Sequence, residues 1–173
     1  MKDLVRTYVG LLAGPVVLLV AYFTVPVGWF GPHHPRISWT AFGVLLAVLG
    51  AGVLREVRMQ VLGQSRHPVP RILVLLCGAL VVFSTAYLAM SKEPGELDGL
   101  VTKVDALYFT VITMATVGYG DIHPAGQAAR IVVMIQLLYT VVFLTTGVTA
   151  LTRQVKTRAV QRARHREQRD DRR

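Results

Sequence analysis

The sequence predicts an all-α membrane protein in which four helices span the membrane and a fifth, shorter helix enters it without crossing. Of the 173 residues, 53% are hydrophobic and only 17% are charged, which is more apolar than an average soluble domain of this size. The charged residues gather in short connectors and at the C-terminus, while long runs contain none. This separation is typical of a chain that crosses a membrane several times.

Four apolar runs approach the length of about 20 residues that a helix needs to cross a bilayer. They cover Tyr8 to Phe30, Trp39 to Leu54 (extendable through Val57), Ile72 to Met90, and Ile131 to Leu151. The first run is long and ends in aromatic residues rather than at a small-residue cleavage site, so it does not predict a signal peptide. A fifth run, Ala106 to Ala115, is too short to span and predicts a re-entrant helix.

Basic residues predict the orientation of the chain. The connector at residues 55–71 carries four arginines against one acidic residue, and nine basic residues follow Leu151. The connector at residues 91–105 is acidic instead, with four acidic residues against two lysines. The positive-inside rule therefore places both termini in the cytoplasm of a multi-pass cell-membrane protein and residues 91–130 outside. Such an arrangement requires an even number of spans, which agrees with the four runs.

Several other classes of protein are disfavoured. The net charge of +9 resides on connectors and the tail, so we expect no nucleic-acid partner. Cys77 is the only cysteine, which excludes a disulfide framework and a cysteine-built metal site. No His, Cys, Ser or acidic residues cluster at catalytic spacing, so we expect neither an enzyme nor an organic cofactor. An excess of arginine over lysine hints at a bacterial source.

The stretch "TMATVGYGDIHP", residues 113–124, lies between the re-entrant run and the last spanning run. Irregular backbone at membrane depth is tolerated only where protein buries it or where it lines a water-filled cavity, so this order predicts a pore. Residues 116–121 resemble, without a gap, the TVGYG filter and following aspartate of tetrameric potassium channels. The resemblance covers a pore unit at residues 72–153 and implies a homotetramer in which each chain supplies an outer helix, a pore helix, a filter and an inner helix.

The resemblance implies a potassium-selective channel that conducts K⁺ passively. Backbone carbonyls of Thr116, Val117, Gly118 and Tyr119 would bind K⁺, with the Thr116 hydroxyl closing the inner ring. Successive carbonyls can face one axis only if the backbone alternates into left-handed conformations, which explains Gly118 and Gly120. Val117 and Tyr119 would then point away from the axis and pack against the pore helix.

The pore helix is expected from about Asp105 to Ala115, with Asp105 as its N-cap. Many relatives carry a carboxylate behind the filter, and this chain has Ile112 at that position. Tyr108 aligns with a residue that donates a hydrogen bond to the filter aspartate in some relatives. Tyr108 therefore either supports the filter through Asp121 or merely packs.

Spacing from the filter predicts which residues of the inner helix line the central cavity. Relatives often carry a hinge glycine where this chain has Thr140 and Val141, so the resemblance implies that any bending occurs lower, near the cytoplasmic end. The expected bending point is Gly147, and the expected cavity residues are Thr140, Val141, Leu144 and Val148. Beneath the inner mouth, the basic residues Arg153, Lys156 and Arg158 are expected to meet membrane lipids, with anionic headgroups as the partner. The alternatives are a helical bundle and a solvated tail (residues 154–173) that only enforces topology.

The first 60 residues have no match to the pore unit, from which a connector at residues 61–71 separates them. Neither of their two spans contains an internal basic residue, so we expect no arginine-bearing voltage-sensor helix. We also expect no C-terminal ligand-binding domain. Small residues recur at every fourth position, which predicts close helix packing at Gly10 and Gly14 and at Gly43, Ala47 and Ala51.

Three alternatives to a potassium channel remain open. A potassium transporter would need several pore loops in one longer chain, and this sequence has one. A non-selective cation channel would lack the filter tyrosine or the second glycine, and both are present here. A non-conducting subunit that modulates other channels is compatible with every residue of the motif.

Overall fold

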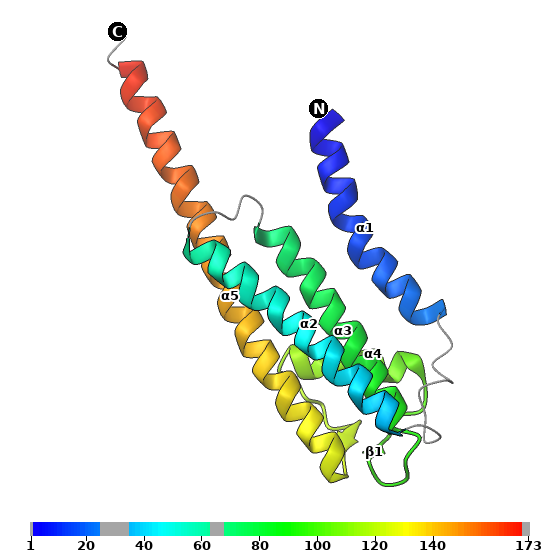
Figure 1. Ribbon diagram of the computed structural model, residues 1–173. Helices are drawn as coiled ribbons and strands as arrows, with labels where there is room; N and C mark the ends of the chain where they lie inside the picture. Colours follow the sequence, from blue (N-terminus) through cyan, green and yellow to red (C-terminus); the bar gives the residue numbers. More distant parts are fainter. Residues whose placement is uncertain (1, 25–34, 63–67, 171–173) are drawn as a thin grey trace.

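The computed structural model describes residues 2–24, 35–62 and 68–170, with side chains described at residues 13–24, 39–62, 71–149 and 152. Helices dominate, and two short strands lie near the predicted filter (Figure 1). In chain order the elements are α1 (Lys2–Thr24), α2 (Pro35–Val61), α3 (Pro68–Met90), β1 (Leu97–Asp98), α4 (Lys103–Met114), β2 (His123–Pro124) and α5 (Gln127–Asp170).

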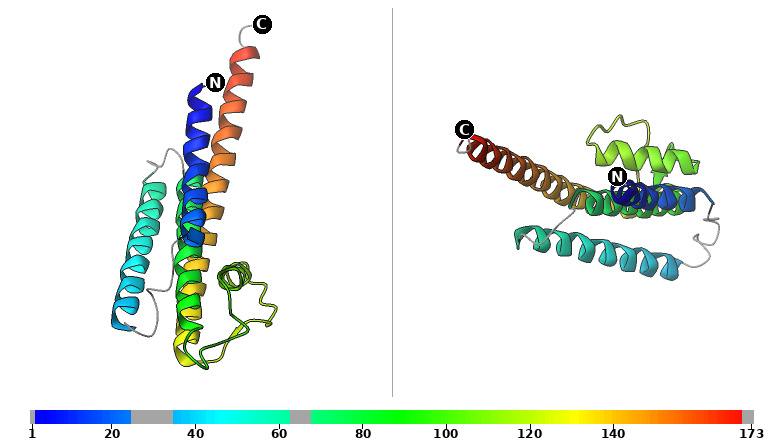
Figure 2. Two further views of the ribbon diagram at one scale, coloured as in Figure 1. Left: turned by 90° about the vertical axis from the view of Figure 1, so that its right-hand side faces the viewer. Right: turned by 90° about the horizontal axis from the view of Figure 1, so that it is seen from above.

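Helix α3 is the centre of the arrangement, because α1, α2, α4 and α5 all pack against it. Helices α1, α3 and α5 form one layer, with α2 on one face and the short helix α4 on the other (Figure 2). Helix α1 starts and α5 ends at the same end of the molecule, and both strands lie toward the opposite end (Figure 1). This agrees with an even number of passes, whereas the orientation in a membrane stays a prediction.

Among the described residues, three helices are long and apolar enough to cross a membrane: Trp39–Val61, Arg71–Met90 and Gln127–Thr149. They correspond to the second, third and fourth predicted spans. The first predicted span falls on α1, whose described side chains make up a shorter apolar helix, Ala13–Thr24. Residues 25–30 of that span lie outside the described part of the chain. Four spanning helices therefore remain a prediction.

Four fully buried polar side chains, Ser84, Tyr87, Thr110 and Gln136, tie α3, α4 and α5 together. We call them the Gln136 network. The Gln136 amide donates to the Thr110 carbonyl at 2.9 Å and accepts from the Tyr87 hydroxyl at 2.6 Å. The Ser84 hydroxyl donates to the Thr110 hydroxyl at 3.0 Å. Since polar groups buried away from water must find partners inside the protein, these bonds specify where α4 lies.

Aromatic rings surround this network and extend the packing to α2. Tyr87 meets Phe109 of α4 edge-to-face with ring centroids 4.9 Å apart, and Phe83 meets Tyr139 of α5 at 5.8 Å. The Tyr139 hydroxyl donates to the Leu46 carbonyl of α2 at 2.6 Å. Edge-to-face pairs add to the stabilisation that area burial provides, and α2, α3, α4 and α5 all contribute residues to one core.

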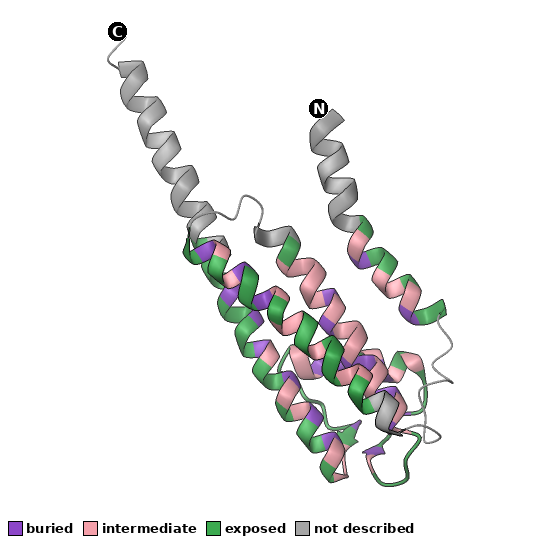
Figure 3. Cartoon of the chain, viewed as in Figure 1, coloured by how far each residue is buried: buried purple, intermediate pink, exposed green. Residues whose placement is uncertain are grey.

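The predicted small-residue faces are found in part. A Cβ added to Gly14 would lie 3.2 Å from Val74 Cγ2, so α1 approaches α3 closely there. The partner position Gly10 lies outside the described side chains. On α2, the predicted stripe of Gly43, Ala47 and Ala51 is exposed in the single chain (Figure 3).

The close approach of α2 to its neighbours occurs at other glycines. A Cβ on Gly52 would lie 2.8 Å from Leu75 Cδ2, and one on Gly50 would lie 3.0 Å from the Tyr139 hydroxyl. The inward face of α2 includes Phe42, Leu46 and Val53, whose large side chains join the core. The spacing of these large residues, rather than the spacing of small ones, sets the rotation of the helix.

The Gln136 network generates a prediction for stability. In Gln136→Leu, the buried Tyr87 hydroxyl loses its acceptor, and we expect the free energy of unfolding to fall by about 1–3 kcal/mol. Denaturant unfolding in detergent measures the change. Met134→Leu, on an exposed face of the same helix, is the matched control. Equal unfolding of the two variants would show that the network does not hold α4.

Candidate ion-binding segment and its supports

Helix α4 begins earlier than the sequence predicted, because its N-cap is Thr102 and not Asp105. The Thr102 hydroxyl accepts from the Asp105 backbone N–H at 3.1 Å, and Asp105 Oδ2 accepts from the Thr102 N–H at 2.7 Å. Asp105 thus occupies the third helical position of a capping box, in which the side chain of each residue bonds to the backbone N–H of the other. The hydrogen bond from the Thr102 N–H is the main cause that lowers the pKa of Asp105.

The C-terminal end of α4 starts the candidate filter. The Ile112 carbonyl accepts from the N–H of Val117 at 2.9 Å and from that of Gly118 at 3.4 Å, while the Thr116 N–H donates to the Thr113 carbonyl at 3.0 Å. Carbonyls at the helix end that have no partner inside the helix therefore accept hydrogen bonds from the residues that follow and hold them against α4. In this chain the backbone of Ile112, rather than a carboxylate at that position, contacts the filter.

Every second residue of the candidate filter has a left-handed backbone. The φ angles are 57° at Thr116, 57° at Gly118 and 82° at Gly120. The prediction of left-handed Gly118 and Gly120 is confirmed. Thr116 was not predicted, although it lies two residues before Gly118 and the same alternation extends to it. Residues with a Cβ adopt this region at a cost, so the surroundings hold Thr116 there.

Residues 115–121 are all exposed in the single chain. Tyr119 is 72% exposed and Val117 is 51% exposed within one chain, so the packing of these side chains against the pore helix stays a prediction. A Cβ added to Gly118 or Gly120 would meet no atom within 4 Å. Glycine is therefore required at these two positions by the backbone conformation and not by lack of space.

Asp121 is held from two sides just after the candidate filter. The Tyr108 hydroxyl donates to Asp121 Oδ2 at 2.9 Å, so the hydrogen bond that the sequence suggested is present. This bond to a carboxylate raises the pKa of Tyr108. On the other side, a Cβ at Gly99 would lie 2.6 Å from the Asp121 carbonyl oxygen. Gly99 also has φ 82°, so only glycine fits there without strain.

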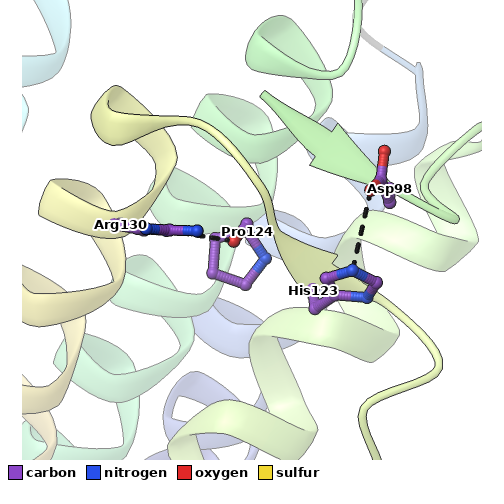
Figure 4. A network of polar contacts seen from close by, with 4 residues as sticks. All are labelled: Asp98, His123, Pro124 and Arg130. Atoms are coloured by element: carbon purple, nitrogen blue, oxygen red, sulfur yellow. Dashed lines mark hydrogen bonds and ion pairs between the residues drawn. The ribbon is translucent and has the colours of Figure 1, made fainter. Parts of the chain in front are cut away.

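The acidic connector pairs with the segment that follows Asp121. Strands β1 and β2 are antiparallel, with Asp98 opposite His123 and Leu97 opposite Pro124. Asp98 Oδ2 lies 3.6 Å from His123 Nε2, and Arg130 donates to the Pro124 carbonyl at 3.4 Å (Figure 4). Asp98 and His123 are both largely exposed, so their ion pair adds little to stability.

Glu96 joins the same connector to the start of α5. Its carbonyl accepts from the N–H groups of Ala125 at 3.0 Å and Gly126 at 3.1 Å, and its carboxylate accepts from the Ala129 N–H at 2.9 Å. A carboxylate at this end is favoured by the helix dipole and satisfies an N–H that has no partner inside the helix. Sequence reasoning missed this cap, because it is formed by a residue about thirty positions away from the helix that it caps.

The inner-helix residues fall on different faces of α5. Thr140 is 2% exposed within one chain, and its hydroxyl donates to the Gln136 carbonyl at 3.0 Å. The prediction that Thr140 lines the central cavity is therefore wrong, since further chains could only bury it more. Leu144 and Val148 are exposed. Val141 is turned partly toward α2, where it lines a cavity of about 320 Å³.

The predicted bending point and the predicted lipid contacts remain untested. Helix α5 continues without interruption through Gly147 to Asp170. A Cβ on Gly147 would meet no atom within 4 Å, so space does not restrict this position. Arg153, Lys156 and Arg158 lie on α5, but their side chains lie outside the described part of the chain.

Comparison with known proteins adds family information to this geometry. Residues 72–157 match the model of a family described as "Ion channel". The chain is 43% identical over 67 residues to "Two pore potassium channel b" of Oryza sativa, covering 38% of this chain and 19% of the relative. It is 32% identical over 76 residues to "Hyperpolarization-activated voltage-gated potassium channel" of Methanocaldococcus jannaschii, covering 44% and 35%.

A third relative points the same way. The chain is 33% identical over 69 residues to "Voltage-gated potassium channel Kch" of Escherichia coli, covering 40% of this chain and 15% of the relative. The chain thus spans about a third or less of the length of these curated relatives. No solved structure matches the chain. Residues 72–157 are therefore similar to an ion channel domain, and these relatives are named as potassium channels.

Proposed function

We propose that the protein is a potassium-selective channel of the cell membrane, in which four copies of residues 116–120 surround one pore. The observation that carries the proposal is the alternation of left-handed residues at Thr116, Gly118 and Gly120 directly after a short helix. Such alternation lets consecutive carbonyls face one side of the strand. Four such strands can surround a dehydrated K⁺ with oxygens at the carbonyls of residues 116–119.

The surfaces that one chain leaves open support assembly as a homotetramer. Residues 115–121 are exposed, including the large side chain of Tyr119. Leu144 and Val148 extend the open apolar surface along α5. A single strand cannot enclose an ion. A closed symmetric ring of copies would surround the ion with carbonyl oxygens and would also cover these exposed apolar side chains.

Helix α4 supplies an electrostatic contribution. Its C-terminal end adjoins the filter, and its N-terminal end carries the capping box of Thr102 and Asp105. The C-terminal end of a helix carries partial negative charge, which favours a cation nearby. Four copies directed toward one axis would therefore stabilise K⁺ beside the inner end of the filter.

The test is a recording from the purified full-length protein in bilayers under potassium and sodium gradients. We expect potassium-selective current, and we expect Gly118→Ala to abolish it, because a Cβ in the left-handed region costs about 1–2 kcal/mol per chain. Gly95→Ala is the matched control, since Gly95 also has positive φ and open space around it but lies in the outer connector.

Two results would contradict this function. Absence of current from well-folded wild-type tetramers would favour a non-conducting subunit that modulates other channels. Potassium selectivity that persists in Gly118→Ala would exclude the carbonyl cage, and a potassium transporter would then have to be considered.

The contact between Tyr108 and Asp121 generates a prediction about filter stability. In Tyr108→Phe, the outer end of each filter strand loses a hydrogen bond worth about 1 kcal/mol. We expect faster loss of current during sustained conduction, measured as the decay of macroscopic current, with selectivity retained. Asp121→Asn keeps an oxygen acceptor for the tyrosine and should decay more slowly than Tyr108→Phe. Identical decay in wild type and Tyr108→Phe would contradict this role.

The basic tail is proposed to bind anionic lipid headgroups, each basic residue near the surface contributing about 1 kcal/mol. We expect a higher open probability in anionic than in neutral bilayers. The combined change of Arg153, Lys156 and Arg158 to Gln should abolish that difference. The same change at Arg164, Arg166 and Arg169, farther along the tail, is the matched control. Equal open probability in both bilayers for all three proteins would leave the tail as a topology signal.

A further inference from the structure

The end of α1 contacts the beginning of α4, although the two lie about eighty residues apart in the chain. The Lys103 ammonium donates to the carbonyls of Tyr22 at 3.2 Å and Phe23 at 2.9 Å. In return, the buried Tyr22 hydroxyl donates to the Lys103 carbonyl at 2.7 Å. We call this set, Tyr22, Phe23 and Lys103, the α1–α4 latch.

The latch satisfies two backbone carbonyls at the C-terminal end of α1. A helix leaves its last four carbonyls without partners inside the helix, which here are those of residues 21–24. The Thr24 hydroxyl contacts the Ala21 carbonyl at 3.3 Å, and Lys103 serves Tyr22 and Phe23. Three of the four carbonyls are thus satisfied, two of them by a residue of α4.

Lys103 is placed against the preference of its own helix. It is the first residue of α4, where the helix dipole carries partial positive charge and disfavours a cation. The negative end of α1 compensates this, because its carbonyls lie within hydrogen-bond distance of the ammonium group. The contact with α1 therefore explains why a lysine stands at a helix position that disfavours a cation.

The other contacts of these helices transmit the position of α1 to the candidate filter. Helix α1 approaches α3 closely at Gly14, so the middle of α1 is also held against α3. Helix α4 has 12 residues and is hydrogen-bonded along its length. At its far end, the Ile112 carbonyl binds the N–H groups of Val117 and Gly118. A shift of Lys103 therefore moves the carbonyl against which the filter folds.

We propose that Lys103 is a positioning residue through which α1 holds α4, so that α1 acts as a modulatory helix of the pore. The inference rests on the proposed channel function. It assigns a role to a helix that lies outside the family match at residues 72–157. Loss of the latch frees the start of α4, so the filter spends less time in its conducting conformation. This lowers the open probability without changing which ion passes.

The experiment compares single-channel records of full-length wild type, Lys103→Met and Lys103→Arg in the same bilayer. We expect Lys103→Met to lower the open probability by about tenfold, the change expected when a charge-assisted hydrogen bond is lost. Lys103→Arg keeps a charged donor and should restore most of the wild-type value. Single-channel current and the potassium–sodium ratio should stay unchanged in both variants. Lys92→Met, in the outer connector, controls for removal of a positive charge.

A second variant keeps the proposal testable if Lys103→Met fails to assemble. Tyr22→Phe retains the ring and removes the hydroxyl, which donates to the Lys103 carbonyl and also contacts Ser84, so a smaller fall in open probability is expected. Where both variants assemble, the two changes together should be less than additive, because they act on one contact. Wild-type open probability in Lys103→Met, or in Tyr22→Phe where only that variant assembles, overturns the latch. Absence of potassium current in wild type would instead overturn the channel function.

Discussion

The position of the middle of the short helix α4 depends on one buried amide, that of Gln136. A helix of 12 residues between two longer ones gains little stability by itself, so its place must come from contacts with its neighbours. Gln136 contacts the carbonyl of Thr110 in α4 and the hydroxyl of Tyr87 in α3 from a position fully inside the core. Because these groups are removed from water, their hydrogen bonds make the arrangement of α3, α4 and α5 specific rather than merely apolar.

The segment at residues 116–121 combines a strained backbone with firm attachment at both of its ends. The Ile112 carbonyl holds the start of the segment, and the Tyr108 hydroxyl holds Asp121 at its end. Between these points the chain buries no side chain, so its conformation depends on the two attachments and on surfaces outside the single chain. Thr116, with φ 57°, therefore keeps its strained conformation through these attachments and those outside surfaces.

Sequence reasoning found the features that depend on local chemistry. The left-handed glycines and the short helix before them were predictable, because glycine has a backbone preference and a run of ten apolar residues cannot span a bilayer. The errors arose where several elements compete. Asp105 was taken as N-cap although Thr102, three residues earlier, forms the capping box with it. Thr140 was assigned to the cavity by spacing alone although its side chain is buried within one chain. Contacts such as Lys103 with Phe23 join distant segments and leave no periodic signal in the sequence.

The outer connector divides into a part that cannot change length and a part that can. From Glu96 onward it is tied by hydrogen bonds to Ala125, Gly126 and Ala129, and Gly99 lies directly against the Asp121 backbone. Residues 92–95 before it are exposed, and a Cβ added to Gly95 would meet no atom within 4 Å. Insertions and deletions in descendants of this chain should therefore accumulate at residues 92–95. A peptide epitope inserted between Pro94 and Gly95 would be displayed at the surface while the ion-binding segment keeps its geometry.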